Sequence, residues 1–262
     1  MSNLQRVLDR IPGFSGATVE QQLSDGPTNA SYLLARAGQL FVLRIDKKAA
    51  RELGLDRLNE QRVYQAVSVA GMAPAMVYSN LSEGIVVRPY LPGRSWTADD
   101  LASFAQLQRL GCLLRRLHGL PPVGTAFDPL GAARRYAGPM ADTQPASHVE
   151  DLLRRMEQLA HDSKKFPGPA VLCHNDLVCQ NVLEGESLAL IDWEYAAIGD
   201  PFFDLAVVLQ HHQLDDTAAD VLLRSYFERE ATADELSHLA QQRDFYQCLL
   251  ELWRHKLGNG NG

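Results

Sequence analysis

The segment HNDLVCQN occupies residues 174–181, and a short apolar run, LALI at residues 188–191, is followed directly by Asp192. Within the first segment Asp176 precedes Asn181 by five residues, which gives the pattern HxDxxxxN. Another apolar run, AVL, lies just upstream. Short apolar runs bounded by polar residues predict strands. We therefore expect a strand, loop, strand arrangement that brings the three polar side chains to one end of a small sheet, facing a single cleft.

These three side chains suit the transfer of a phosphoryl group from a nucleotide. The reaction needs a carboxylate that orients or deprotonates the attacking hydroxyl, and it needs oxygen ligands that hold Mg²⁺ on the phosphates. Asp176 suits the first role, and Asn181 and Asp192 suit the second. Any one of them alone would more often be a loop residue that satisfies a turn backbone. Their combination around one loop favours a shared catalytic site.

Composition indicates an ordinary globular protein. The chain has 262 residues, of which 46% are hydrophobic, and a formal net charge of −7. Such a charge argues against nucleic-acid binding, because that function concentrates Lys and Arg on one face. No apolar stretch approaches the roughly 18 residues that predict a membrane span, and the first residues lack an export signal. We expect a cytoplasmic protein without a membrane partner, and the sequence leaves its oligomeric state unknown.

The four cysteines, at positions 112, 173, 179 and 248, show no CxxC spacing. We expect reduced thiols that act as small buried hydrophobic groups. Cys173 and Cys179 flank His174, but three candidate ligands without a partner cluster give weak support for zinc.

The first third of the chain is predicted to be rich in β-structure. Residues 17–23, 31–36 and 40–45 are short runs rich in Val, Leu and aromatic residues, and Ala37-Gly38-Gln39 between the last two signals a hairpin. One helix, which contains Glu60, is predicted over residues 51–70. Two more strand candidates, AMVYS and GIVVRPY, follow it.

A Pro-Gly break at residues 91–94 is the predicted boundary between two lobes. Helix signals dominate after it, beginning with the capping-box pattern of Thr97 and Asp100 and leucines at helical spacing. The sequence therefore predicts an α+β protein. Its N-terminal lobe, residues 1–90, would contain an antiparallel sheet with one helix, and its C-terminal lobe, residues 91–262, would be mainly helical.

The pattern HxDxxxxN resembles the catalytic loop of the aminoglycoside phosphotransferase and choline kinase superfamily. IDWEYAAIGDPFFDLA (191–206) is similar to the metal-binding segment of that superfamily, GPTNASYLL (26–34) to the nucleotide-covering loop of choline and thiamine kinases, FVLRI (41–45) to their third strand, and VVRPYLPG (86–93) to their hinge. The resemblance covers nearly the whole chain. It implies a bilobal protein-kinase-like fold and an ATP- and Mg²⁺-dependent phosphotransferase acting on a hydroxyl of a small metabolite.

The resemblance also implies residue roles. Asp176 would be the catalytic base, Asn181 and Asp192 the metal ligands, and His174 a structural residue. The nucleotide-binding residues would be Thr28, Asn29, Arg44, Glu60, Pro89, Tyr90 and Leu91. Arg44 stands where protein kinases place a phosphate-binding lysine, with Glu60 as its ion-pair partner; arginine keeps the charge but changes the geometry of the contact. The loop around Thr28 has a single glycine, and taken alone it would be a plain hairpin connection.

The acceptor pocket is predicted in the helical half beside Asp176, where carboxylates and aromatic rings follow Asp192. Such a mixture suits a cationic substrate. The candidate acceptor-binding residues are Glu194, Asp204, Trp193 and Trp253. Two alternatives stay open: the aromatic residues belong to the core, and Asp204 caps a helix or braces the catalytic loop. Similarity to choline, ethanolamine and thiamine kinases favours one of these acceptors over an aminoglycoside or a sugar.

Three other functions stay open at this point. The chain could be an aminoglycoside or sugar kinase of the same superfamily, a nucleotide-binding pseudokinase that regulates a partner, or a metal-dependent hydrolase. The intact set of Asp176, Asn181 and Asp192 disfavours the pseudokinase. His174, His211 and His212 lack a recognisable ligand spacing, which disfavours the hydrolase.

Overall fold

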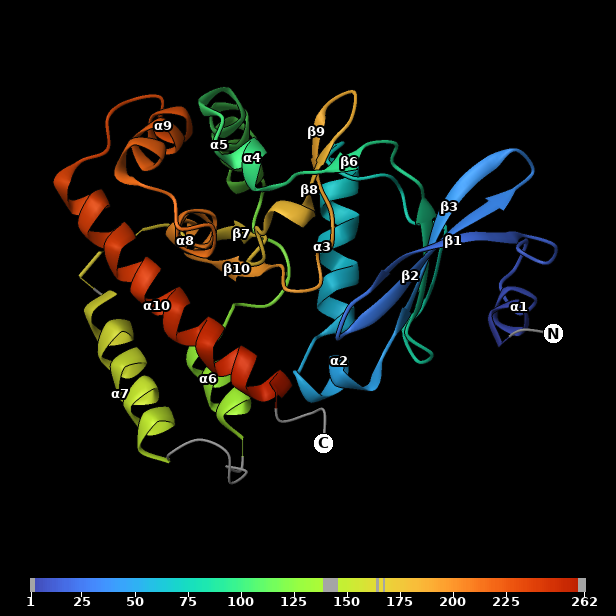
Figure 1. Ribbon diagram of the computed structural model, residues 1–262, viewed down its shortest axis with the longest axis horizontal. Helices are drawn as coiled ribbons and strands as arrows, with labels where there is room; N and C mark the ends of the chain where they lie inside the picture. The colour runs from blue at the N-terminus through green and yellow to red at the C-terminus, as the bar shows by residue number, and fades with distance from the viewer. Residues whose placement is uncertain (1–2, 139–145, 164, 167, 259–262) are drawn as a thin grey trace.

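A five-stranded sheet and a mostly helical half form two lobes, which lie side by side in Figure 1. The computed structural model describes residues 3–138, 146–163, 165–166 and 168–258. The predicted α+β architecture, with an antiparallel sheet in the N-terminal lobe and helices in the C-terminal lobe, is confirmed.

The sheet of the N-terminal lobe has the strand order β1-β2-β3-β5-β4, and every neighbouring pair is antiparallel. Its strands are β1 (Thr18–Asp25), β2 (Asn29–Arg36), β3 (Gln39–Asp46), β4 (Tyr78–Asn80) and β5 (Ile85–Pro89). The predicted hairpin joins β2 to β3, with Arg36 paired to Gln39. Ala37 and Gly38 between them both have positive φ, 49° and 77°. Two such residues make the tight turn whose twist matches that of the flanking strands.

Helices cover both faces of this sheet. They are α1 (Asn3–Leu8), α2 (Lys48–Glu52) and α3 (Arg57–Val69). Leu8 and the residues after α1, including Phe14, pack against Leu34 and Val87 on one face of the sheet. The prediction of a single helix over residues 51–70 was wrong, because the chain leaves the helical conformation at Gly54, where φ is 76°. Asp56 then caps α3 by accepting hydrogen bonds from the backbone N–H groups of its first turn.

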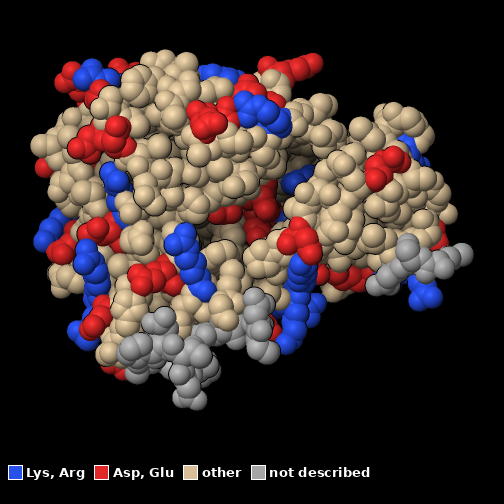
Figure 2. Space-filling model, viewed as in Figure 1, with Lys and Arg blue, Asp and Glu red and all other residues tan. Residues whose placement is uncertain are grey.

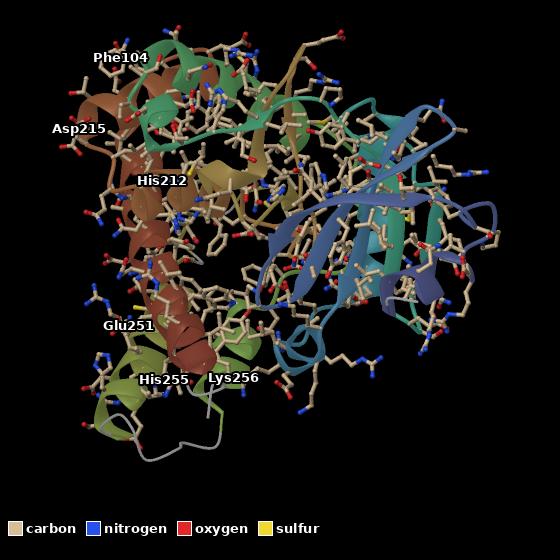
Figure 3. All side chains as sticks on the ribbon, turned by 45° about the vertical axis from the view of Figure 1, so that its right-hand side comes forward. Phe104, His212, Asp215, Glu251, His255 and Lys256 are labelled. Atoms are coloured by element: carbon tan, nitrogen blue, oxygen red, sulfur yellow. The ribbon has the colours of Figure 1, made fainter. Side chains whose placement is uncertain are left out.

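The C-terminal lobe surrounds the larger of two hydrophobic cores. Its helices are α4 (Ala98–Leu101), α5 (Phe104–His118), α6 (Pro129–Ala137), α7 (Ala146–Ser163), α8 (Pro201–His211), α9 (Asp216–Phe227) and α10 (Ala233–Gly258). The predicted capping box of Thr97 and Asp100 begins α4. In Figure 3, Phe104 and Asp215 lie at one end of this lobe, whereas Glu251 and Lys256, near the end of α10, lie at the other.

Two small sheets lie where the lobes meet. One pairs β7 (Val171–Cys173) with β10 (Ala197–Gly199), and the other has the order β6 (Arg94–Ser95), β8 (Val182–Glu184), β9 (Leu188–Leu190). The expectation of one small sheet containing both runs around residues 174–181 was therefore wrong. A 3₁₀ turn at Cys179–Asn181 leads into β8, which pairs with β9, while β7 pairs with β10 instead.

No helix in the described part of the chain is both long enough and apolar enough to cross a membrane. All four cysteines are free thiols; Cys112 is exposed and the other three are buried.

Candidate active site

The loop after β7 is held in shape by Asp204, which lies in the first turn of α8. This carboxylate is 0% exposed, and it accepts hydrogen bonds from the backbone N–H groups of His174 (2.8 Å) and Asn175 (2.7 Å). Asn175 has φ of 62°, a conformation in which short polar residues are enriched. Asp200 and Pro201 begin α8 as N-cap and first helical residue, which aims the first turn at the loop.

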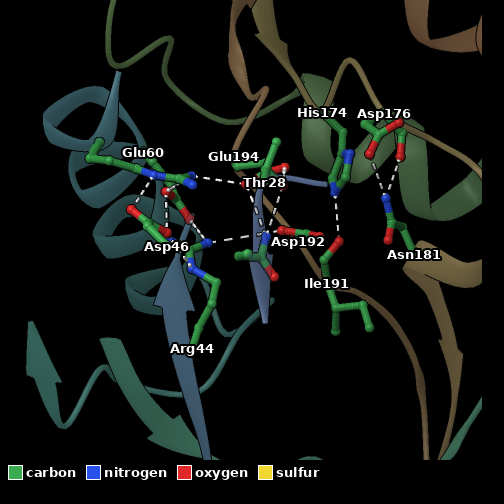
Figure 4. Close-up of polar contacts among 12 residues, drawn as sticks. Thr28, Arg44, Asp46, Glu60, His174, Asp176, Asn181, Ile191, Asp192 and Glu194 are labelled. Atoms are coloured by element: carbon green, nitrogen blue, oxygen red, sulfur yellow. Dashed lines mark hydrogen bonds and ion pairs between the residues drawn. The ribbon is translucent and has the colours of Figure 1, made fainter. Parts of the chain in front are cut away.

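Asp176 and Asn181 lie together at the end of this loop (Figure 4). The Asn181 amide Nδ2 donates hydrogen bonds to the side-chain Oδ2 and to the backbone oxygen of Asp176, both at 2.8 Å. Burial, reinforced by the charges of Asp192 and Glu194, raises the pKa of the Asp176 carboxyl to about 8. The amide donor leaves Asn181 Oδ1 available as an acceptor or ligand.

Asp192 follows β9 with φ of 64°, and the adjacent Ile191 N–H donates to the backbone oxygen of Asn181 (2.9 Å). This bond ties the two loops together. Burial raises the pKa of the Asp192 carboxyl despite the opposing charges of Arg44 and Arg88. His174 is fully buried: its Nε2 lies 3.0 Å from the Ile191 oxygen, and burial lowers its pKa. These contacts hold the two loops in register.

A network of ion pairs lies beside these loops (Figure 4). The predicted pair of Arg44 and Glu60 is present as a two-pronged contact, whose second bond, Nη2 to Oε2, is 2.8 Å long. Arg57 at the start of α3 donates to Asp46 (2.7 Å), to Glu60 (2.8 Å) and to Glu194 (3.0 Å). Arg57 was not predicted as a site residue, although it connects the N-terminal lobe to the loop after β9.

The β1–β2 connection also reaches the other lobe. The hydroxyl of Thr28 donates to Glu194 Oε1 (2.7 Å), and the Asn29 amide donates to Glu194 Oε2 (3.2 Å). Thr28, Asn29 and Glu194 are all buried. The predicted role of Thr28 and Asn29 was nucleotide contact, but both side chains are bound to Glu194 and line the neighbouring cavity described next.

Two cavities meet at Asn181 and Asp192, which line both of them. The first has a volume of about 430 Å³, and Pro89, Tyr90 and Leu91 form part of its wall. The second, of about 540 Å³, contains Asp176 in its wall. Its aromatic lining residues are Phe127, Tyr136, Tyr195, Phe203, Tyr246 and Trp253. Figure 2 shows the molecule hollowed between the lobes, with acidic side chains at the floor of the hollow.

The four predicted acceptor-binding residues are divided among different surroundings. Glu194 and Trp253 line the second cavity. Trp193 lines the first cavity and packs on His174, with ring centroids 4.7 Å apart. Asp204 lines neither cavity, because its carboxylate is used entirely inside the lobe. The sequence left open whether Asp204 caps a helix or braces the loop after β7. The structure supports the second alternative, because Asp204 holds the backbone of His174 and Asn175.

Sequence reasoning missed Phe127 and Tyr136, which come from the loop before α6 and from α6 itself. Neither residue lies near a motif, so only tertiary structure brings them to the cavity. Among the described residues, one buried group, His118, Cys173 and Asp204, has metal-ligand atoms close together. In this group, His118 and Asp204 are already engaged in hydrogen bonds. The three histidines considered for a hydrolase, His174, His211 and His212, form no such group within the described ranges.

The two-lobed fold with its cleft belongs to the protein-kinase-like class. A sequence profile of the phosphotransferase enzyme family matches residues 19–238. Protein LicA of Haemophilus influenzae is 28% identical over 214 residues, which cover 77% of this chain and 60% of LicA. A thiamine kinase of Escherichia coli is 31% identical over 199 residues, which cover 73% of this chain and 68% of that kinase. A crystal structure of a choline/ethanolamine kinase family protein from Mesorhizobium loti superposes with a TM-score of 0.82 at 26% identity, over 98% of this chain and 86% of that one. The chain therefore belongs to the phosphotransferase enzyme family, and it spans about three fifths of that LicA protein.

Proposed function

We propose that this protein transfers the γ-phosphoryl group of ATP to the hydroxyl of a small amino alcohol or related cation, such as choline, ethanolamine or thiamine. The observation that carries the proposal is the meeting of two cavities at Asn181 and Asp192, with Asp176 on the side of the aromatic cavity. A donor and an acceptor bound in these cavities would face each other across the three side chains.

In the proposed reaction the acceptor hydroxyl oxygen attacks the γ-phosphorus. The bond from that phosphorus to the β–γ bridging oxygen breaks, ADP leaves, and the hydroxyl proton passes to the Asp176 carboxylate. The hydrogen bond from Asn181 orients this carboxylate before the acceptor arrives. Positioning of this kind accounts for most of the catalysis in phosphoryl transfer.

The residues present fit Mg²⁺ as the metal that accompanies the nucleotide. Asn181 Oδ1 and the Asp192 carboxylate are hard oxygen donors on the wall that the two cavities share. When bound there, Mg²⁺ would neutralise charge on the phosphates. An adjacent cation would also lower the pKa of Asp176 again, since opposite charge favours the carboxylate.

The first cavity suits the nucleotide base. The Tyr90 N–H donates to the Leu40 oxygen (3.0 Å), so this residue directs its backbone toward β3. Pro89 and Leu91 flank this residue and line the cavity, and in this proposal their backbone groups contact the base. Val42 and Leu190 add apolar walls.

The second cavity suits a cation, because it combines aromatic faces with carboxylates. Its described carboxylates are Asp176, Asp192 and Glu194, of which Asp192 also lines the first cavity, and aromatic and aliphatic groups form much of the remaining lining. A quaternary ammonium or an aromatic cation gains from aromatic faces and from nearby carboxylates. These features favour a cationic acceptor of the proposed class over an uncharged one.

The experiment is an acceptor panel with Mg-ATP, read out as ADP release. Choline is compared with its uncharged isostere 3,3-dimethylbutan-1-ol, and thiamine, ethanolamine, a sugar and an aminoglycoside complete the panel. We expect kcat/KM for choline or thiamine to exceed that of the uncharged isostere by about tenfold or more, as cation–π contacts predict. Turnover confined to sugars or aminoglycosides would support the alternative kinase, and nucleotide binding without any turnover would support the pseudokinase.

The proposed base is tested separately. Asp176→Asn should lower kcat by about a hundredfold or more while ATP still binds, because only proton transfer and orientation are lost. Asp99→Asn, an exposed change in the first turn of α4, is the matched control and should leave kcat unchanged. Full activity in Asp176→Asn would overturn the role of this residue.

A further inference from the structure

The basic residues beside the catalytic loops are already paired with carboxylates. Arg44 and Arg57 contact Asp46, Glu60 and Glu194, and Arg44 also lies 3.9 Å from Asp192. Two guanidinium groups thus face four carboxylates, which leaves an excess of negative charge when all are ionised. A nucleotide brings further negative charge into this region. A further cationic side chain, in addition to these two arginines, would favour the binding of the nucleotide.

Arg88 on β5 meets this description. It pairs with Val42 across the sheet, and Val86, two residues earlier, pairs with Arg44. Side chains two residues apart in a strand share a face, so Arg88 and Arg44 lie on the same, cleft-facing side. Arg88 is half-buried and lines the first cavity.

Neighbouring groups feel the charge of Arg88, but none of the described residues forms an ion pair with it. Among the described residues that line either cavity, Arg88 is the one lysine or arginine, and no carboxylate in the described ranges lies within ion-pair distance of it. Its positive charge opposes the burial that raises the pKa of the Asp192 carboxyl and of the Tyr64 hydroxyl, so both groups lie near the guanidinium. A phosphate within hydrogen-bond distance would give this partly buried guanidinium a closer anionic partner than Asp192.

We propose that Arg88 binds the phosphate nearest to the nucleoside, in addition to any contact made by Arg44. The inference rests on the proposed function, since it takes the first cavity as the nucleotide site. A nucleotide with its base at Pro89 to Leu91 and its terminal phosphates at Asn181 and Asp192 must run past β5 between them. Arg88 occupies that interval, and its planar fork suits phosphate oxygens.

The experiment measures the binding of AMP and of adenosine by calorimetry, without metal and without acceptor. Adenosine lacks the phosphate, so it separates contacts with the base from contacts with the anion. Arg88→Met should weaken AMP binding by about tenfold or more and adenosine binding by less than about twofold. Arg62→Met, an exposed change on α3 that lines neither cavity, is the matched control and should leave both affinities unchanged.

The outcomes are distinct. Equal losses for AMP and adenosine in Arg88→Met, or no loss for either, would overturn the phosphate contact even though nucleotide binding stands. Arg88→Lys, which keeps the charge, should recover part of the AMP affinity, and this recovery distinguishes a lost contact from a misfolded variant. If the wild-type chain bound neither AMP nor Mg-ATP, the proposed function itself would fail.

Discussion

The carboxylate of Asp204 receives three hydrogen bonds in the interior of the C-terminal lobe. Two come from the backbone of His174 and Asn175, and the third from His118 Nε2 at 3.0 Å. The His118 Nδ1 in turn lies 2.8 Å from the Tyr226 hydroxyl. Because a carboxylate only accepts, this arrangement assigns the Nε2 proton to His118. Helices α5 and α9 thereby hold the residue that shapes the catalytic loop.

Replacing Asp204 with Asn tests this brace. The amide retains one acceptor oxygen and turns an NH₂ group toward a buried donor, so we expect the free energy of unfolding to fall by about 2–4 kcal/mol. We also expect kcat to fall by at least about tenfold, because the loop carrying Asp176 loses its support. Urea unfolding and ADP release measure the two effects. The exposed Asp216→Asn on α9 is the control. A stability loss without any change in kcat would show that the brace does not position the loop.

At the scale of residues, the sequence could predict contacts between side chains that lie close together in the chain. Asp176, Asn181 and Asp192 are close in the chain, and their meeting follows from one loop and one short hairpin. Arg57 and Arg88 escaped prediction because their roles depend on partners from distant segments. The Arg57 contact with Glu194, for example, joins residues separated by 137 positions.

At the scale of elements, two N-terminal segments converge on Glu194. The β1–β2 connection contributes Thr28 and Asn29, and the first turn of α3 contributes Arg57. Burial raises the pKa of the Glu194 carboxyl, and the neighbouring charge of Asp192 acts in the same direction. The donors from the N-terminal lobe offset the cost of burying this group. These contacts link the two lobes at the mouth of the aromatic cavity.

A double-mutant cycle measures this link. Thr28→Val keeps the side-chain shape and removes the hydroxyl donor, and Glu194→Gln removes the charge that it serves. We expect a coupling free energy of about 0.5–1.5 kcal/mol from urea unfolding, because a hydrogen bond to a charged group is stronger than one to the neutral Gln amide by roughly this amount. Thr217→Val, at an exposed position of α9, should show no coupling to Glu194→Gln. Strictly additive losses for Thr28→Val and Glu194→Gln would contradict the link.

Element prediction succeeded where hydrophobic periodicity was sustained. The leucines of α5 and the short apolar runs of β2 and β3 were recognised, and the hairpin between these strands was recognised from its glycine. The break between α2 and α3 was missed because the apolar pattern continues across it, although Gly54 and Asp56 interrupt the backbone. Strands β6, β8 and β10 have at most three residues each, too few to show a period.

At the scale of the whole molecule, each lobe forms most of the wall of a different cavity. The N-terminal sheet and hinge form much of the first cavity, the helices form most of the aromatic cavity, and the catalytic loops lie on the boundary. The predicted division into a sheet lobe and a helical lobe needed only composition and turn signals. The cavities themselves could not be predicted, since their walls combine residues from more than one lobe.

The stability of the folded molecule should depend on pH through His212 at the end of α8 (Figure 3). Burial, and then the neighbouring His211, lowers the pKa of His212 to about 4 from an ordinary value of 6.5. Below pH 6.5 the His212 imidazole therefore binds a proton in the unfolded chain but stays neutral in the folded chain until the pH approaches 4. The stabilisation is complete above pH 6.5 and is lost as the pH falls toward 4.

We expect His212→Gln to reduce this dependence. Each pKa unit corresponds to about 1.4 kcal/mol, and partial solvent exposure screens the effect. From pH 7 to pH 4.5 the wild-type free energy of unfolding should therefore fall by about 1–2 kcal/mol more than that of His212→Gln. Urea unfolding at the two pH values measures the difference, and His161→Gln, an exposed change on α7, should behave like the wild type. If the free energies of unfolding of wild type and His212→Gln changed in parallel with pH, the pKa of His212 would be the same in the folded and the unfolded chain, which would contradict this prediction.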